Sequence, residues 1–332
     1  MEKAIAIVVS YNRIELLKEC ITALKNQTRK LEGILIINNG STDGTERWLS
    51  TQQDIFYITQ ANSGSGGGFQ TGINWAYKNG YSWIWCMDDD GLPRENALEQ
   101  LLKNVPNHQC LLNSAVINKE DKESFVWKTK NYQKLAEVNT TSIKGIGHPF
   151  NGTLLHRSIV EKVGLPKAGL FLWGDETEYY YRIVKQHHIP VYTIPGSVHY
   201  HPAASFNFKQ DWDFTTSWKM YYYVRNRFHV HKAKHPFRMI AVINYLCFLV
   251  AFFFATIIYQ RSDKLKKLSF ISWPVKDAIS NNFSVTPAIV LAKTRTWELS
   301  PYSQQIQFFF KNARYYTGKL FSAERSVKTA KA

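Results

Sequence analysis

Four short apolar runs in the N-terminal part of the chain limit most strongly how it can fold. They lie at residues 4–9, 34–37, 55–58 and 83–87. The stretches between them carry helical apolar spacing or turn-forming residues. Buried strands that alternate with helices form a mainly parallel sheet with helices on both faces. We therefore predict a doubly wound α/β fold. Residues 118–142 are polar, and no regular element is predicted there.

Polar and glycine-rich segments follow each predicted strand. In parallel sheets, ligands bind beyond the carboxyl ends of the strands, so these segments are expected to meet at one edge. Consecutive glycines at 64–68 let the backbone approach a ligand closely. They match neither a P-loop nor a strict dinucleotide-binding fingerprint, and the alternative is a flexible connection.

Asp88, Asp89 and Asp90 directly follow the fourth apolar run. Adjacent carboxylates repel one another and are costly to desolvate, and a bound cation removes that cost. Oxygen ligands suit Mg²⁺ or Mn²⁺, which commonly also bind a substrate's phosphates. The triplet therefore indicates a metal–diphosphate site, and the alternative is an acidic turn that ends a strand.

A second acidic cluster, Asp175, Glu176 and Glu178, follows the aromatic stretch 171–173. Such a carboxylate suits general-base chemistry, although acidic residues also favour the start of a helix. His199 and His201 alternate along a predicted strand at 191–200, so they share one face. Either histidine could complete a metal site with the triplet, or serve a structural role.

The basic excess lies entirely in the C-terminal third. From residue 215 onward the chain has 19 Lys/Arg and 4 Asp/Glu, which accounts for the whole net charge of +15. This asymmetry suggests a polyanionic partner, either nucleic acid or an anionic membrane leaflet. The apolar stretch 239–259 is long enough to span a bilayer, and basic residues flank both of its ends. It fits a helix that lies in a leaflet or a membrane span, with a buried core helix as the alternative.

The aromatic and basic stretch 221–227 suits either binding of a lipid-linked phosphate or sugar, or packing of a helix on the domain. The strand–helix pattern loosens from about residue 98, and the basic part begins after about residue 213, so we divide the chain into a domain at 1–213, with halves 1–97 and 98–213, and a basic helical region at 214–332. We expect the second region to associate with a membrane.

Taken in order, these motifs resemble those of family 2 glycosyltransferases with the GT-A fold, over roughly residues 4–230. Within that family the chain looks most like bacterial galactofuranosyltransferases and the related rhamnosyltransferases. The three consecutive aspartates favour the galactofuranosyl branch. The segments that carry the resemblance are 7–13, 38–44, 62–69, 87–93, 173–182 and the strand ending at His201.

The resemblance implies a role for each matching residue. Mn²⁺ or Mg²⁺ would be held by Asp88, Asp90 and His201, with His199 as the second choice of histidine. Glu176 would be the catalytic base, with Asp175 as the alternative, and Trp173 would lie on the acceptor side. The donor would be bound by Ser10, Arg13, Asn39, Gly67, Gly68, Asp88 and Asp89.

The resemblance also implies the reaction: inverting, metal-dependent transfer of galactofuranose from UDP-galactofuranose. The acceptor would be a lipid-linked or growing cell-surface glycan at the cytoplasmic face of the cell membrane. The alternative within this class is a rhamnosyltransferase that uses dTDP-rhamnose. The alternative of another class is a non-catalytic protein that binds anionic lipid or nucleic acid, but acidic clusters at the sheet edge argue against it, and we expect no nucleic-acid partner.

Overall fold

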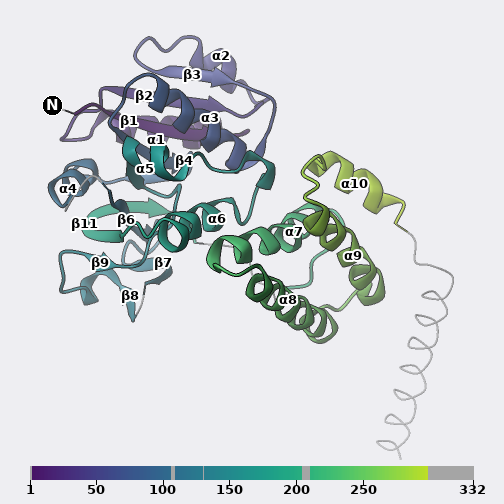
Figure 1. The fold of residues 1–332 in the computed structure, drawn as a ribbon. Helices are drawn as coiled ribbons and strands as arrows, with labels where there is room; N and C mark the ends of the chain where they lie inside the picture. The colour runs from purple at the N-terminus through teal and green to yellow at the C-terminus, as the bar shows by residue number, and fades with distance from the viewer. Residues whose placement is uncertain (1, 106–108, 130, 204–209, 298–332) are drawn as a thin grey trace, which may run out of the picture.

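The computed structural model describes residues 2–105, 109–129, 131–203 and 210–297. It consists of a part built around a sheet, followed by a part built from helices (Figure 1). The last stretch of the predicted basic region, 298–332, lies outside the described residues.

The central sheet is mixed but mainly parallel in its N-terminal half. The strand order is β3-β2-β1-β4-β10-β6-β11-β5, and β1 pairs in parallel with both β2 and β4. The antiparallel strand β10 sits between β4 and β6, and β6 pairs in parallel with β11. The strands of this order are β1 (Ala4–Ser10), β2 (Gly33–Asn38), β3 (Phe56–Thr59), β4 (Trp83–Asp88), β5 (Leu92–Pro93), β6 (Leu111–Asn118), β10 (Thr153–His156) and β11 (Val191–His201).

Helices cover both faces of this sheet. Ala6 and Val8 of β1 point into one core with α1, α2 and α4, while Ile5 and Ile7 point into the other with α3, α5 and α6. This alternation confirms the predicted α/β fold with helices on both faces. The helices of this part are α1 (Ile14–Lys25), α2 (Thr45–Leu49), α3 (Gly64–Lys78), α4 (Ala97–Lys103), α5 (Arg157–Val163), η2 (Ala168–Leu170), α6 (Asp175–Tyr181) and the π-helical turn η3 (Arg182–Gln186).

The prediction that residues 118–142 lack regular structure is wrong. The segment contains β7 (Ser124–Thr129), β8 (Tyr132–Lys134) and the short helix η1 (Leu135–Glu137), and β9 (Ile143–Lys144) follows. Phe125 of β7 pairs with Ile117 and packs on a small core beside β6 and β11. The charged run 119–123 forms the turn before β7, and it hides the short strand that follows.

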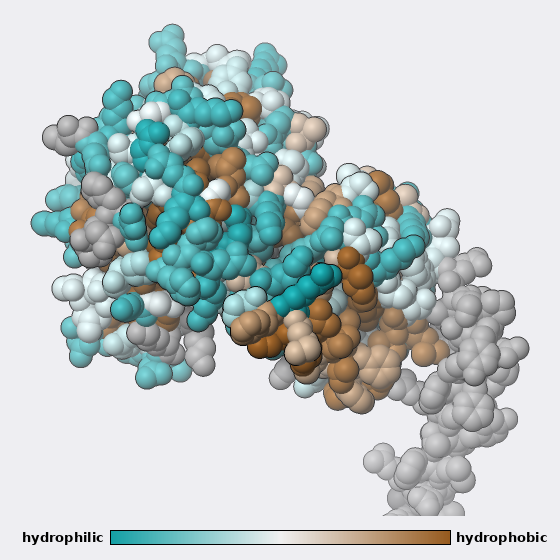
Figure 2. Space-filling model, viewed as in Figure 1, coloured by the Kyte–Doolittle hydropathy of each residue, from teal (hydrophilic) through white to brown (hydrophobic). Residues whose placement is uncertain are grey.

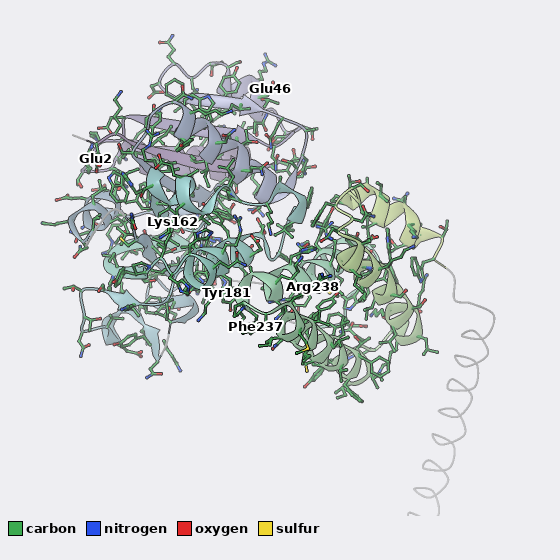
Figure 3. The ribbon with its side chains drawn as sticks, in the orientation of Figure 1. Glu2, Glu46, Lys162, Tyr181, Phe237 and Arg238 are labelled. Carbon is green, nitrogen blue, oxygen red and sulfur yellow. The ribbon has the colours of Figure 1, made fainter. Side chains whose placement is uncertain are left out.

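The helical part contains α7 (Ser217–Lys234), α8 (Arg238–Tyr259), α9 (Lys264–Ser280) and α10 (Pro287–Arg295). The stretch 221–227 lies on α7, where Tyr221, Tyr222, Arg225 and Asn226 are all fully buried. This burial favours the packing interpretation of that stretch. Figure 3 labels Tyr181, Phe237 and Arg238 where the two parts of the protein meet.

Among the described residues, α8 is the one helix long and apolar enough to cross a membrane, and only 22% of its most apolar stretch is buried. A hydrophobic surface over α8 is visible in Figure 2. The buried side of the helix packs on α7 and α9 through Tyr245, Phe248 and Phe252. Its exposed side chains recur every three or four residues and are therefore on one face: Met239, Ile243, Leu246, Val250, Phe253, Phe254, Ile257 and Ile258.

Candidate active site

The aspartate triplet lies at the carboxyl end of β4, in the middle of the sheet. Asp89 is almost fully buried and accepts a hydrogen bond from Ser10 Oγ (2.8 Å) at the end of neighbouring β1. Arg13 Nη1 lies 3.3 Å from Asp89 Oδ1 and 2.8 Å from Asp90 Oδ2. Ser10 and Arg13 therefore contact the triplet at the same edge of the sheet, as the sequence predicts. Their contacts hold the segment that carries Asp88 and Asp90.

His201 joins Asp88 and Asp90 in one cluster, and one ligand atom from each residue lies within 4.8 Å of the others. The short strand β5 brings them together, because it follows the triplet and pairs with β11 just before His201. His199 is not in this cluster. His199 is fully buried, and burial lowers its pKa to about 3. It packs so closely on Gly91 that a Cβ added to Gly91 would lie 2.3 Å from His199 Nε2.

The hydrogen bonding of His201 suits a metal ligand. Its Nδ1 lies 2.7 Å from the carbonyl oxygen of Pro202, which can only accept, so Nδ1 carries the proton. Nε2 then faces Asp90 Oδ1 at 3.3 Å. Metal-binding histidines commonly donate their second N–H to a backbone carbonyl in this way.

The electrostatics of the cluster also favour a cation. Burial, reinforced by the charges of Asp90 and Asp89, raises the pKa of Asp88 well above that of an ordinary carboxyl group. A divalent cation would offset this cost and stabilise the ionised form. Two carboxylates and an imidazole suit Mn²⁺, and the carboxylates suit Mg²⁺. The residues present therefore fit a divalent metal.

The glycine-rich segment forms the first turns of α3 rather than a loop. Gly64 has a φ of 69°, and a Cβ there would lie 2.1 Å from the carbonyl oxygen of Phe171. A Cβ on Gly67 would meet Ser63 Oγ at 2.2 Å, and one on Gly68 would meet Val9 Cγ1 at 2.5 Å. The absence of side chains therefore lets α3 pack closely on β1 and on the segment before α6, so a flexible connection is excluded.

Asn39 is buried at the same edge of the sheet, and its side chain holds the start of α3. Its Nδ2 donates to the carbonyl of Gly64 (2.9 Å), and its Oδ1 accepts from Gln60 Nε2 (2.9 Å) and the Ser63 amide (3.2 Å). Both ends of the amide are occupied by the protein. A direct contact of Asn39 with the donor stays a prediction.

The three acidic residues at the start of α6 have different surroundings. Asp175 is fully buried and accepts a hydrogen bond from Ser65 Oγ (2.6 Å); burial and the neighbouring Glu176 raise its pKa well above the ordinary value. Glu178 is also buried and forms ion pairs with Lys167 (2.6 Å) and Arg182 (2.9 Å). Glu176 alone of the three is partly exposed, and its role as the base stays a prediction.

Two residues of this region were not predicted from the sequence. The Trp127 ring lies 5.2 Å from His201 and 4.9 Å from His148, between centroids. Burial lowers the pKa of His148 to about 4, and the charge of Glu176 acts on it in the opposite direction. Trp127 and His148 thus form a row between the Asp88–Asp90–His201 cluster and Glu176. The one available signal was the alternation of Phe125 and Trp127 in a polar segment.

Trp173 lies just before Glu176 and is partly buried against the helical part. Its ring stands perpendicular to that of Tyr223 at 6.3 Å, and Lys219 Nζ lies 5.8 Å from it. The predicted acceptor role of Trp173 stays a prediction.

This chain is similar to several known proteins. The family model described as "Glycosyl transferase family 2" matches residues 5–164. Galactofuranosyltransferase GlfT1 of Mycolicibacterium smegmatis is 30% identical over an alignment of 224 residues, and the match covers 63% of this chain and 74% of the relative. The chain belongs to glycosyl transferase family 2. GlfT1 of Mycobacterium tuberculosis strain H37Rv is 28% identical over 222 residues, covering 63% and 73% of the two chains.

A solved structure of Staphylococcus aureus TarS, residues 1–349, superimposes with a TM-score of 0.53 at 11% identity, over 93% of this chain and 92% of that one. At that identity the likeness concerns the fold alone. Family membership makes this chain a glycosyltransferase that uses a nucleotide-sugar donor and a glycan acceptor.

Proposed function

We propose that this family 2 enzyme transfers galactofuranose from UDP-galactofuranose, with inversion, to a lipid-linked or growing cell-surface glycan. Two observations support the proposal together. The curated relatives that cover 63% of this chain are named galactofuranosyltransferases. The cluster of Asp88, Asp90 and His201 has ligand types and a spacing that fit a divalent metal ion.

In this proposal Asp88, Asp90 and His201 hold Mn²⁺ or Mg²⁺. The bound metal supplies charge that stabilises the departing diphosphate. Arg13, partly exposed beside the triplet, adds a positive charge at the same edge. Ser10 and Asp89 keep the loop rigid through their hydrogen bond, so the donor would meet a preorganised site.

Glu176 is the proposed catalytic base. It accepts the proton of the acceptor hydroxyl while that oxygen forms a bond to the anomeric carbon and the bond from that carbon to the diphosphate oxygen breaks. Attack opposite the leaving group inverts the anomeric centre. Asp175 is less suitable because it is fully buried and its carboxylate already accepts a hydrogen bond from Ser65.

We further propose that α8 holds the enzyme on the cytoplasmic face of the membrane without crossing it. One side of α8 is exposed and apolar, while the other packs on α7 and α9. A spanning α8 would draw these two helices, with their buried Arg225 and Lys267, into hydrocarbon, which is costly. Lys232 and Lys234 before α8, and Lys264 and Lys266 after it, suit an anionic leaflet.

A donor panel with Mn²⁺ tests the proposed donor. Purified full-length enzyme is given UDP-galactofuranose, its ring isomer UDP-galactopyranose, or dTDP-rhamnose, and nucleotide release and transfer are measured. Turnover with UDP-galactofuranose alone is expected. Turnover with dTDP-rhamnose alone would identify a rhamnosyltransferase and refute the proposal.

Two pairs of variants test the residue roles. Asp90→Ala should abolish metal-dependent turnover, whereas Asp54→Ala, at an exposed surface ion pair, should not change it. Glu176→Gln should lower kcat by about 10²-fold or more with UDP affinity retained. If Asp175→Asn has that effect and Glu176→Gln does not, the base is Asp175.

A further inference from the structure

The segment that leads into Glu176 has an unusual backbone. Phe171 has a φ of 65°, Trp173 a φ of 55° and Gly174 a φ of 122°. Residues other than glycine rarely adopt positive φ, and they persist there only where surrounding contacts hold them. Glu176 follows almost directly, so the contacts that fix this segment also set the position of its carboxylate.

Asn226 of α7 supplies several of these contacts. It is fully buried, and its Nδ2 lies within hydrogen-bonding distance of the main-chain oxygens of Leu170 (2.7 Å), Leu172 (2.8 Å) and Trp173 (3.2 Å). Its Oδ1 accepts a hydrogen bond from Arg225 Nε (3.0 Å). Because a guanidinium can only donate, this bond fixes which end of the amide faces the carbonyls.

Arg225 extends the same set of contacts. Its Nη2 donates to the carbonyls of Gly169 (2.7 Å) and Leu170 (3.1 Å), and its guanidinium lies 4.8 Å from the Tyr222 ring and 5.2 Å from the Phe283 ring. No carboxylate among the described residues forms an ion pair with it, although it is fully buried. A buried charge of this kind is costly, and an apolar side chain would serve packing as well.

Helix α7 is anchored on its other side to α8. Tyr245 of α8 donates from its hydroxyl to the carbonyl of Val224 (3.2 Å), and its ring lies 5.2 Å from that of Phe228. In Figure 1, α7 lies between α6 and α8. The contacts of Arg225 and Asn226 therefore join the catalytic segment to the helix proposed to lie on the membrane.

We propose that Arg225 and Asn226 are positioning residues for the transfer reaction. They hold the carbonyls of residues 169–173 and thereby aim the Glu176 carboxylate at the acceptor hydroxyl. This inference rests on the proposed function, in which Glu176 is the base. Neither residue needs to touch the donor, so their loss should impair turnover and leave donor binding intact.

The test compares Asn226→Ala with Ser217→Ala in the full-length enzyme. Ser217→Ala removes a fully buried hydroxyl from the start of the same helix, and that hydroxyl bonds Phe214 (2.8 Å) and Thr294 rather than residues 169–173. Nucleotide release from the donor that proves active, UDP binding and melting temperature are measured for each. Because a displacement of about 1 Å can cost ~10²-fold in rate, Asn226→Ala should lower kcat by that factor. Its donor KM, UDP affinity and melting temperature should match those of Ser217→Ala.

A double variant separates positioning from general damage. If Asn226 acts through Glu176, adding Asn226→Ala to Glu176→Gln should lower kcat less than threefold further. A full additional ~10²-fold loss, or an equal loss of kcat in Ser217→Ala, would overturn the proposal. If Asn226→Ala does not fold, Arg225→Lys is judged by the same criteria, since it keeps the charge and gives up the forked donor.

The two proposals fail in different ways. A large loss in Glu176→Gln with full activity in a folded Asn226→Ala would refute the positioning role alone. Full activity in Glu176→Gln would refute the assignment of Glu176 as the base, and with it the proposal that Arg225 and Asn226 orient that base.

Discussion

The exposed face of α8 allows a quantitative prediction of membrane binding. Ile243, Leu246, Val250 and Phe254 are 51–56% exposed and point away from α7 and α9. Full burial of such side chains contributes roughly 1.5–3 kcal/mol each, so covering the exposed half contributes about 1 kcal/mol. Replacing all four with serine should weaken membrane partitioning by ~4 kcal/mol, which is about 10³-fold.

Vesicle sedimentation measures this change directly. The full-length protein and the four-serine variant are mixed with vesicles that contain or lack anionic lipid, at low and high salt. The control variant, Phe56→Ser with Tyr57→Ser, removes exposed aromatic side chains from β3, which is far from α8 in the fold (Figure 1). It should partition like the wild type, and high salt should weaken binding because it screens the lysines that flank α8.

Two results would refute this reasoning. A change of less than tenfold in partitioning would mean that this face does not enter the leaflet. A large drop in melting temperature in the absence of vesicles would mean that the four side chains pack against the protein after all. Protease protection on sealed vesicles further separates the two membrane arrangements, because a spanning α8 would place residues before and after it on opposite sides.

Three further predictions concern the sheet-containing part. Gly68→Ala should destabilise the protein by roughly 1–3 kcal/mol in denaturant unfolding, because its Cβ would lie 2.5 Å from Val9 Cγ1; an unchanged midpoint would contradict the close packing of α3 on β1. Trp127→Ala should raise the Mn²⁺ concentration for half-maximal activity about tenfold, because the ring supports His201. Trp127→Phe keeps an aromatic ring and should raise it much less. EDTA should abolish the turnover of the wild type and of both variants, and added Mn²⁺ should restore it. Asp175→Asn should raise the melting temperature more at pH 7 than at pH 4: the folded pKa of Asp175 is raised above its unfolded value of about 3.9, so its contribution to stability falls as the pH rises above that value. An equal shift at both pH values would contradict this.

The sequence was sufficient to predict the elements whose apolar pattern is strong. The continuous runs that became β1, β2 and β4 are buried on both faces, so their residues have few alternatives to a central strand. The approach of His201 to Asp88 and Asp90 was predicted from the family resemblance. Its physical cause, the pairing of β5 with β11, depends on a strand of two residues that has no recognisable pattern.

Local pattern could not predict roles that depend on distant contacts. The contact of Gly67 and Gly68 with the donor stays a prediction, and the packing of Gly64 and Gly68 against Phe171 and Val9 could not be read from the glycine run itself. Nothing in the sequence around Asn226 indicates that its side-chain amide faces the carbonyls of Leu170, Leu172 and Trp173. Trp127 was missed because a short edge strand among charged residues resembles a loop.

The contacts of α7 with the segment before Glu176 bear on how a soluble form of this enzyme should be made. A fragment that stops at residue 213 would lose Asn226 and leave three carbonyls exposed, and the ring of Phe171 would lose its stacking partner Tyr222 at 4.8 Å. Such a fragment should stay in solution and bind UDP, yet turn over poorly. The better route to solubility keeps every helix and changes only the outward face of α8.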